Sequence, residues 1–210
     1  MKLLFIGDSI TDSTRANRED PHSTGRGYVF LLESELTAQG EAYEVLNCGV
    51  SGNRVVDLLA RIKKDCINLQ PDVITVLVGV NDVAHELYHQ NGVGPALFEE
   101  VYRILLREMK AALPKVKFIL MAPYLLHGSL SDPYFEDFAQ GVAEYGKIAC
   151  RLAREFDAEF IDLQREFDLA LEKASTEHWS KDGVHPTPAG HTVIAAAWKQ
   201  AFTAWLRKEE

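Results

Sequence analysis

The sequence predicts an α/β fold, a doubly wound parallel sheet of five strands between two layers of helices, in one domain covering residues 1–210. Short apolar stretches typical of strands alternate with helical stretches along the whole chain, which is typical of a parallel α/β sheet. The stretch VITVLVG at 73–79 lacks any polar/apolar alternation, as expected of a strand buried on both faces. A chain of 210 residues is long enough for one substantial core, and no stretch resembles a linker.

The expected helices carry local signals as well as length. Val55, Leu58 and Ile62 recur at helical spacing and would share one apolar face. Gly40 is a typical helix end, and Pro188 suits a first helical turn, where its missing N–H costs little. The expected strands are 2–6, 43–47, 73–79, 116–121 and 159–163, and the expected helices are 28–39, 55–69, 96–113, 135–156 and 188–207.

Composition and charge exclude several classes of protein. The chain has 22 basic and 31 acidic residues and a net charge of -9, which argues against a nucleic-acid partner. The apolar run after Lys2 has only four residues, too short for the core of a signal peptide. No apolar run approaches the length of a membrane span, so we expect a cytoplasmic protein without a membrane partner.

The three cysteines do not form a recognisable framework. Cys48, Cys66 and Cys150 are odd in number and lack the spacing of metal ligands. We therefore expect reduced, buried thiols in a cytoplasmic protein and no metal site.

Polar residues follow the expected strands at the edge where α/β proteins bind ligands. Ser9 follows the first strand, and the loop NCGVSGN, which contains Gly52, follows the second. The third strand is followed by GVND, which contains Asn81, and DGVHP precedes the last helix. Because ligands of open α/β sheets lie beyond the carboxyl ends of the strands, these four loops should converge on one rim.

The residue types in these loops fit nucleophilic catalysis. Ser9 can be the nucleophile, His185 its base, and Asp182 the carboxylate that orients and stabilises the imidazole. Gly183 eases the turn that brings Asp182 back to the ring. The expected oxyanion donors are the backbone N–H groups of Ser9 and Gly52 and the side-chain amide of Asn81. Gly52 also lacks a Cβ that would obstruct a tetrahedral intermediate.

Each of these residues alone also has an ordinary structural explanation. Ser9 could cap the following segment, and Gly52 could serve only as a helix-entry turn. Asn81 and Asp82 could form a polar turn, and Asp182 with His185 could form a surface turn that caps a helix. Their joint occurrence at successive strand ends favours the catalytic interpretation.

Taken together, these blocks resemble the SGNH hydrolases, the GDSL esterase/lipase family. The resemblance rests on GDSI at 7–10, Gly52 in VSGN, GVND at 79–82 and DGVH at 182–185, and extends from residue 3 to about residue 191. It implies a flavodoxin-like three-layer sandwich and ester hydrolysis through an acyl-serine, without a metal or an organic cofactor.

A narrower resemblance is to the intracellular acetylxylan esterases of this family. It rests on LLFIGDSITD, GRGYV, SGNRVVDLLARI, LVGVNDV and VHPTPAGH. It implies a homo-oligomer that removes acetyl groups from xylo-oligosaccharides.

Other residues are assigned supporting roles. Segments 84–95 and 124–137 should form the pocket rim, with aromatic side chains that could stack on sugar. Trp179, just before the Asp182–His185 loop, is expected to bind substrate. Asp8 and Asp12 should hydrogen-bond the turn around Ser9, and His191 should be structural. The rim aromatics are His85, Tyr88, His89, Tyr124, His127, Tyr134 and Phe135.

Two other functions are compatible with parts of the pattern. A lysophospholipase or thioesterase would use the same site and would need a long apolar acyl channel. A non-catalytic ligand-binding protein would cradle phosphate where NCGVSGN enters a helix, but that leaves Asn81, Asp182 and His185 without a role.

Overall fold

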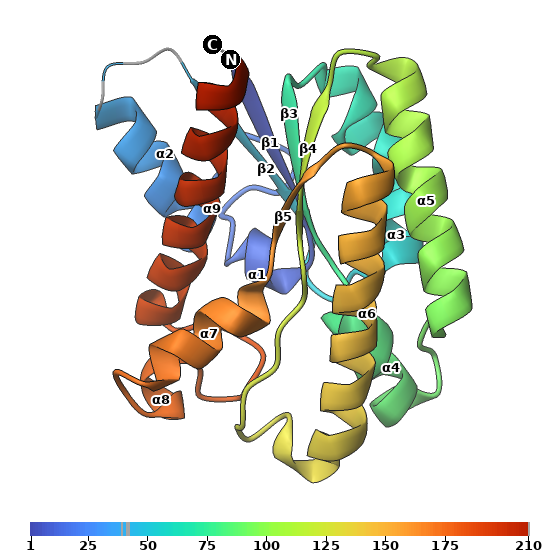
Figure 1. Cartoon of the computed structure of the whole chain (residues 1–210), viewed down its shortest axis with the longest axis vertical. Coiled ribbons are helices and arrows are strands. Elements are labelled where there is room, and N and C mark those ends of the chain that lie inside the picture. Colours follow the sequence, from blue (N-terminus) through green and yellow to red (C-terminus); the bar gives the residue numbers. More distant parts are fainter. Residues whose placement is uncertain (39, 41–42, 210) are drawn as a thin grey trace.

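The computed structural model describes residues 1–38, 40 and 43–209. Its centre is a sheet of five parallel strands in the order β2-β1-β3-β4-β5, which confirms the predicted sheet (Figure 1). All five residues of β3 are buried, as their unbroken apolar run predicted. The strands are β1 Lys2–Gly7, β2 Glu44–Gly49, β3 Val73–Leu77, β4 Lys117–Met121 and β5 Glu159–Ile161.

The order of the strands determines where a ligand site can form. The chain runs from β1 to β2 on one side of β1, and β3 then joins β1 on its other side. Gly7 at the end of β1 pairs with Gly49 of β2 and with Leu77 of β3, so the three strands end at the same level. This reversal of strand order is where doubly wound proteins bind their ligands.

Helices cover both faces of the sheet. On one face α2 (Tyr28–Ala38) packs on α9 (Pro188–Glu209), whose Trp198 donates its indole N–H to Thr75 Oγ1 of β3 at 2.8 Å. On the other face lie α3 (Val55–Asp65), α5 (Pro95–Ala112) and α6 (Phe135–Glu155) (Figure 1). The predicted helices are confirmed to within a few residues. Residue 39 of the first lies outside the described residues, and the second ends at Asp65, before a 3-10 turn at Ile67–Leu69.

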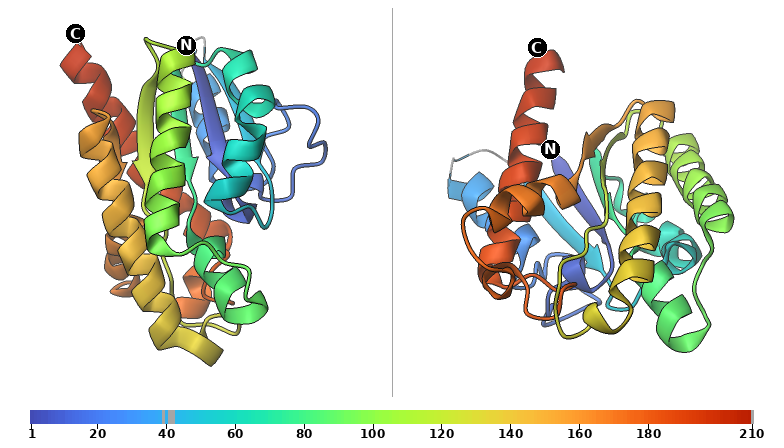
Figure 2. Two further views of the ribbon diagram at one scale, coloured as in Figure 1. Left: turned by 90° about the vertical axis from the view of Figure 1, so that its right-hand side faces the viewer. Right: turned by 60° about the horizontal axis from the view of Figure 1, so that its bottom comes forward.

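Four α-helices of the described chain were not predicted, and all lie towards the carboxyl edge of the sheet, the lower edge in Figure 1. Strand β5 ends at Ile161 rather than at 163 because Asp162 caps a helix, accepting the N–H of Arg165 at 3.2 Å. The sequence analysis expected a polar turn at Asn81 and Asp82 and the start of the pocket rim at residue 84, whereas residues 80–89 form a helix. Both views of Figure 2 place it beside the start of α6. The four helices are α1 Ser9–Asp12, α4 Val80–His89, α7 Leu163–Leu171 and α8 Thr176–Trp179.

The cysteines differ in burial. Cys48 and Cys66 are buried and unpaired, as predicted, whereas the unpaired Cys150 is only partly buried. Burial raises the pKa of the Cys48 thiol to about 11, so it stays protonated near neutral pH. Among the helices of the described chain, none is long and apolar enough to span a membrane.

Candidate active site

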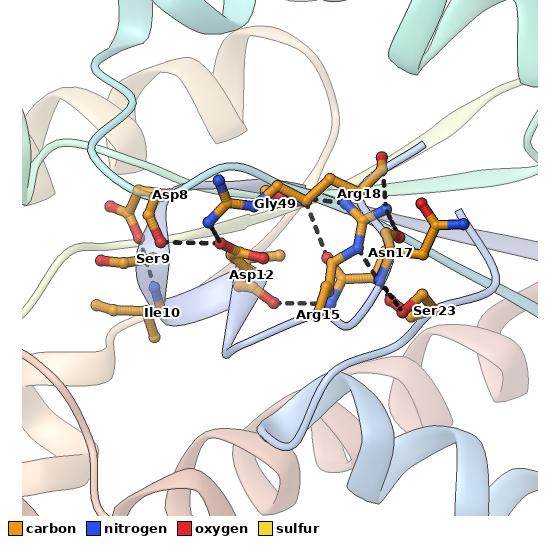
Figure 3. A network of polar contacts seen from close by, with 12 residues as sticks. Asp8, Ser9, Ile10, Asp12, Arg15, Asn17, Arg18, Ser23 and Gly49 are labelled. Carbon is orange, nitrogen blue, oxygen red and sulfur yellow. Dashed lines mark hydrogen bonds and ion pairs between the residues drawn. The ribbon is translucent and has the colours of Figure 1, made fainter. Parts of the chain in front are cut away.

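Ser9 is the first residue of α1, just after the end of β1, and its hydroxyl does not cap the helix. The cap is Asp8, whose Oδ1 accepts the N–H of Ile10 at 2.9 Å (Figure 3). The hydroxyl of Ser9 lies 2.9 Å from His185 Nε2 instead. The capping explanation of this serine is therefore wrong, because the preceding aspartate fills that role.

His185 and Asp182 meet as their spacing predicted. His185 Nδ1 lies 2.7 Å from Asp182 Oδ2, while Asp182 Oδ1 accepts the backbone N–H groups of His185 at 2.7 Å and Val184 at 2.9 Å. Gly183 has φ +89°, a conformation that favours glycine, and a Cβ there would collide with Ser131. The loop thus aligns Asp182, His185 and Ser9 in one chain of hydrogen-bonding groups.

Hydrogen bonds determine the protonation states of Asp182 and His185. Partial burial works to raise the pKa of Asp182, but the hydrogen bonds from His185 and from the loop backbone outweigh it and lower the pKa to about 2. The hydrogen bond to Asp182 raises the pKa of His185, and the nearby Asp8 carboxyl adds to this. With Asp182 ionised, Nδ1 carries the proton and donates it to Asp182, so Nε2 is left to accept the Ser9 hydroxyl.

The predicted oxyanion donors follow β1, β2 and β3. Gly52 has φ +82°, so the backbone conformation demands glycine, and the face where a Cβ would stand is open. Asn81 lies in the first turn of α4 and donates one N–H to the carbonyl of Asn53 at 3.1 Å. Within the described part of the chain, the N–H groups of Ser9 and Gly52 donate to no protein acceptor.

The N-terminus of α3 contacts a protein carboxyl. Asp82 is fully buried there, and its carboxyl accepts the N–H of Val55 at 3.0 Å. Burial raises the pKa of Asp82 to about 8. A protein carboxyl therefore occupies the N–H of Val55 at the helix N-terminus, and this N–H is not available to the phosphate of the ligand-binding alternative.

The Asp182–His185 loop is supported from behind by residues that the sequence analysis missed. Ser180 is fully buried; its hydroxyl donates to His185 O at 2.8 Å and accepts the N–H of Gly183 at 2.9 Å. Tyr124, expected at the rim, is also fully buried, and its hydroxyl donates to Val184 O at 2.8 Å. The rim assignment of Tyr124 is therefore wrong: the ring stacks on Phe167 in the core, with centroids 4.0 Å apart.

Asp12 and Arg15 hold the segments around Ser9 together (Figure 3). Asp12 is fully buried, and its Oδ2 accepts Arg18 Nη2 at 2.6 Å and Ser51 Oγ at 2.8 Å. Arg15 donates to Gly49 O at 3.1 Å and to backbone carbonyls of the loop at 13–27. The expectation that Asp8 hydrogen-bonds the turn around Ser9 is confirmed, whereas the Asp12 carboxylate binds Arg18 and Ser51 instead.

Of the remaining rim aromatics, Tyr88 joins α4 to the loop before α6. The Tyr88 hydroxyl donates to Leu130 O, and the Tyr88 ring meets Tyr134 edge-on, with centroids 5.2 Å apart. His127 stacks on Phe135 with centroids 3.6 Å apart and is largely exposed. A role of these rings in binding sugar stays a prediction.

Trp179 and His191 lie in different surroundings. The indole N–H of Trp179 donates to Ala174 O at 3.2 Å, and its ring lies beside a groove between α7 and α9. Substrate binding by Trp179 stays a prediction.

His191 is buried and its Nδ1 accepts the N–H of Tyr28 at 3.1 Å; burial lowers the pKa of His191 to about 4. Its expected structural role fits these contacts.

Metal chemistry has no obvious ligand set here. No group of three or more His, Cys, Asp or Glu side chains across the described residues is arranged to hold a metal ion. The chemistry that the site can perform with its own residues is attack by an activated serine on an electrophilic carbon, with N–H groups available for the developing negative charge.

Comparison with known proteins agrees with this chemistry. Residues 5–193 match the GDSL-like lipase/acylhydrolase family. An acetylxylan esterase of Geobacillus stearothermophilus is 35% identical over 98% of this chain and 96% of its own, and esterase TesA of Pseudomonas aeruginosa is 26% identical over 71% and 65%.

Solved structures share the fold over nearly the whole chain. The crystal structure of Axe2, an acetylxylan esterase from G. stearothermophilus, superposes with a TM-score of 0.85 at 33% identity, covering 95% of this chain and 93% of that one. A putative GDSL-like lipase from Parabacteroides merdae gives a TM-score of 0.85 at 35% identity, with coverage of 95% and 94%. The predicted three-layer fold is thereby confirmed.

Proposed function

Because the chain belongs to the GDSL-like lipase/acylhydrolase family and is a carboxylic ester hydrolase, we propose that it removes acetyl groups from acetylated xylo-oligosaccharides, with Ser9 as its nucleophile. The observation that carries the proposal is the chain of contacts from Ser9 Oγ to His185 Nε2 at 2.9 Å and from His185 Nδ1 to Asp182 Oδ2 at 2.7 Å. The acetylxylan substrate is inferred from the esterase that is 35% identical over 98% of this chain.

The reaction has two steps. His185 Nε2 takes the proton of the Ser9 hydroxyl as Oγ attacks the acetyl carbonyl, and the imidazolium then gives that proton to the departing sugar hydroxyl. In the second step a water molecule loses a proton to His185 and attacks the acetyl-serine; His185 then gives this proton to Ser9 Oγ as acetate leaves, which restores Ser9. Asp182 stays ionised throughout, as its pKa of about 2 allows.

Three donors stabilise the oxyanion of both steps. Ser9 N–H and Gly52 N–H have no protein acceptor among the described residues, so they can donate to the substrate oxygen. Asn81 uses one amide N–H for Asn53 O and keeps the second for the oxyanion. The pairing of Asn81 with Asn53 fixes the orientation of the amide before substrate arrives.

The proposal extends to the surroundings of the enzyme. Residues 1–210 would form a single catalytic domain, working as a cytoplasmic homo-oligomer, as the resemblance to intracellular acetylxylan esterases implies. Trp179 and the aromatics of α4 and segment 124–137 would contact the sugar.

Initial rates with 4-nitrophenyl acetate, butyrate and octanoate test the substrate class. We expect 4-nitrophenyl acetate to be hydrolysed fastest. Acetylated xylo-oligosaccharides are the next substrates, and we expect the enzyme to release acetate from them. If octanoate leads, the enzyme is a lysophospholipase or thioesterase instead. If none of the esters is hydrolysed, the proposed function is wrong.

The pH dependence tests the role of His185. Protonated His185 cannot accept the proton of Ser9, so kcat/KM for 4-nitrophenyl acetate should rise with pH as the imidazolium loses its proton. Since hydrogen bonding to Asp182 raises the pKa of His185, the midpoint should lie above the usual histidine value. A profile that is flat across the histidine range would contradict His185 as the base.

A further inference from the structure

One guanidinium reaches two of the three elements that carry the proposed oxyanion donors. Arg61 stands on α3 with its side chain only 16% exposed. It donates to Gly7 O at the end of β1 (3.1 Å), to Cys48 O near the end of β2 (2.7 Å), and to Asn53 Oδ1 directly after Gly52 (2.7 Å). It therefore joins the strand end that presents Ser9 to the loop that presents Gly52.

The third donor is reached through Asn53. The side chain of Asn53 is held by Arg61, and its carbonyl accepts Asn81 Nδ2 at 3.1 Å. Asp65 Oδ2 lies 2.9 Å from Arg61 Nη1 and balances its charge, so the guanidinium can stay largely buried. Arg61 is thus bonded to Gly7, two residues before Ser9, and to Asn53, which is next to Gly52. Asn81 is linked to Arg61 by two hydrogen bonds through Asn53.

We infer that Arg61 is a positioning residue that fixes the three oxyanion donors relative to one another; this inference rests on the proposed function. The planar fork of an arginine can donate in several fixed directions at once, which a lysine ammonium on its flexible stem does not reproduce. Arg61 contacts backbone carbonyls, Asn53 and Asp65 rather than the reacting atoms, so it acts on the reaction only through the donors.

The position of these donors matters most in the transition state. Donors of an oxyanion hole act where charge develops, and removing one typically lowers kcat by about 10²- to 10³-fold. A misplacement of about 1 Å costs on the order of 10²-fold. Loosening the Arg61 contacts should therefore reduce kcat more than it changes KM.

The test compares Arg61→Lys and Arg61→Met with Arg103→Lys, hydrolysing 4-nitrophenyl acetate well below the melting temperature. Arg103 is a matched control, because it is also a partly buried helical arginine with a carboxylate four residues away, Glu99 at 2.8 Å. We expect the Arg61 variants to lose on the order of ten- to a hundredfold in kcat with little change in KM. The pH midpoint should stay in place, because Arg61 does not touch His185 or Asp182. The control should keep the wild-type kcat.

A double-mutant cycle separates positioning from general support of the fold. If Arg61 acts through the oxyanion donors, Arg61→Lys should lower kcat by a much smaller factor in an Asn81→Ala background than in the wild type. In an Asp182→Asn background it should lower kcat by the same factor as in the wild type. Equal costs in all three backgrounds would overturn the inference.

Asn53→Ala keeps the test decisive if the Arg61 variants do not fold. It removes the oxygen that binds Arg61 and retains the carbonyl that binds Asn81, so we expect a smaller fall in kcat with KM unchanged. A wild-type kcat in a folded Arg61 variant, or in Asn53→Ala, would overturn the inference about Arg61 and leave the proposed function standing. An inactive wild type would overturn the proposed function instead.

Discussion

Ser9→Ala is expected to lower kcat for 4-nitrophenyl acetate by about 10⁶-fold, because it removes the proposed nucleophile. The Ser9 hydroxyl lies 2.9 Å from His185 Nε2, whereas the helix cap is made by Asp8, so removing the hydroxyl costs no cap. The melting temperature should therefore change little while the activity disappears. Rates and thermal unfolding measured on the same samples check both parts.

Ser34→Ala is the matched control for this loss. Its hydroxyl donates to Phe30 O within α2, away from the site, and its removal should leave kcat unchanged. A Ser9→Ala enzyme that keeps the wild-type rate would show that another group is the nucleophile.

Asp182→Asn is expected to lower kcat by about 10⁴-fold without disturbing the fold. An amide at this position can offer an N–H to His185 Nδ1, which favours the tautomer that cannot accept the Ser9 proton at Nε2. The same substitution removes the main cause of the raised pKa of His185, so the acid limb of the pH–rate profile should move to lower pH. Steady-state rates across pH measure both effects.

A second histidine–aspartate pair serves as the control. Asp20 Oδ1 lies 3.3 Å from His22 Nδ1 on the surface, and Asp20→Asn should change neither kcat nor the pH midpoint. If Asp182→Asn keeps the wild-type kcat and midpoint, Asp182 does not orient His185.

The sheet and the contact between Asp182 and His185 could be predicted because their signals are local. The run at 73–79 is β-branched and unbroken, and Asp182 and His185 are close enough in sequence to meet in one turn. Helix α4 was missed because its first turn, GVND, reads as a loop when taken alone. The sequence offers no local sign that Gly79, at φ +131°, starts a helix there.

The supporting residues could not be predicted because their contacts are long-range. Arg61 reaches Gly7 across 54 positions, and Tyr124 reaches Val184 across 60. No spacing rule connects such pairs before the strands are placed side by side. Tyr124 also shows that an aromatic side chain in a loop near a site can belong to the core rather than to the binding surface.

Covalent labelling with diethyl 4-nitrophenyl phosphate, followed by mass spectrometry, tests most directly whether Ser9 is the nucleophile. This reagent transfers a diethyl phosphoryl group to the activated serine of an esterase and releases 4-nitrophenol. We expect one group per chain, located on Ser9 by peptide mapping, in parallel with loss of esterase activity, and no labelling of Ser9→Ala. Inactivation with the label on another residue, such as Ser51 or Ser180, or with Ser9 unmodified, would contradict the account.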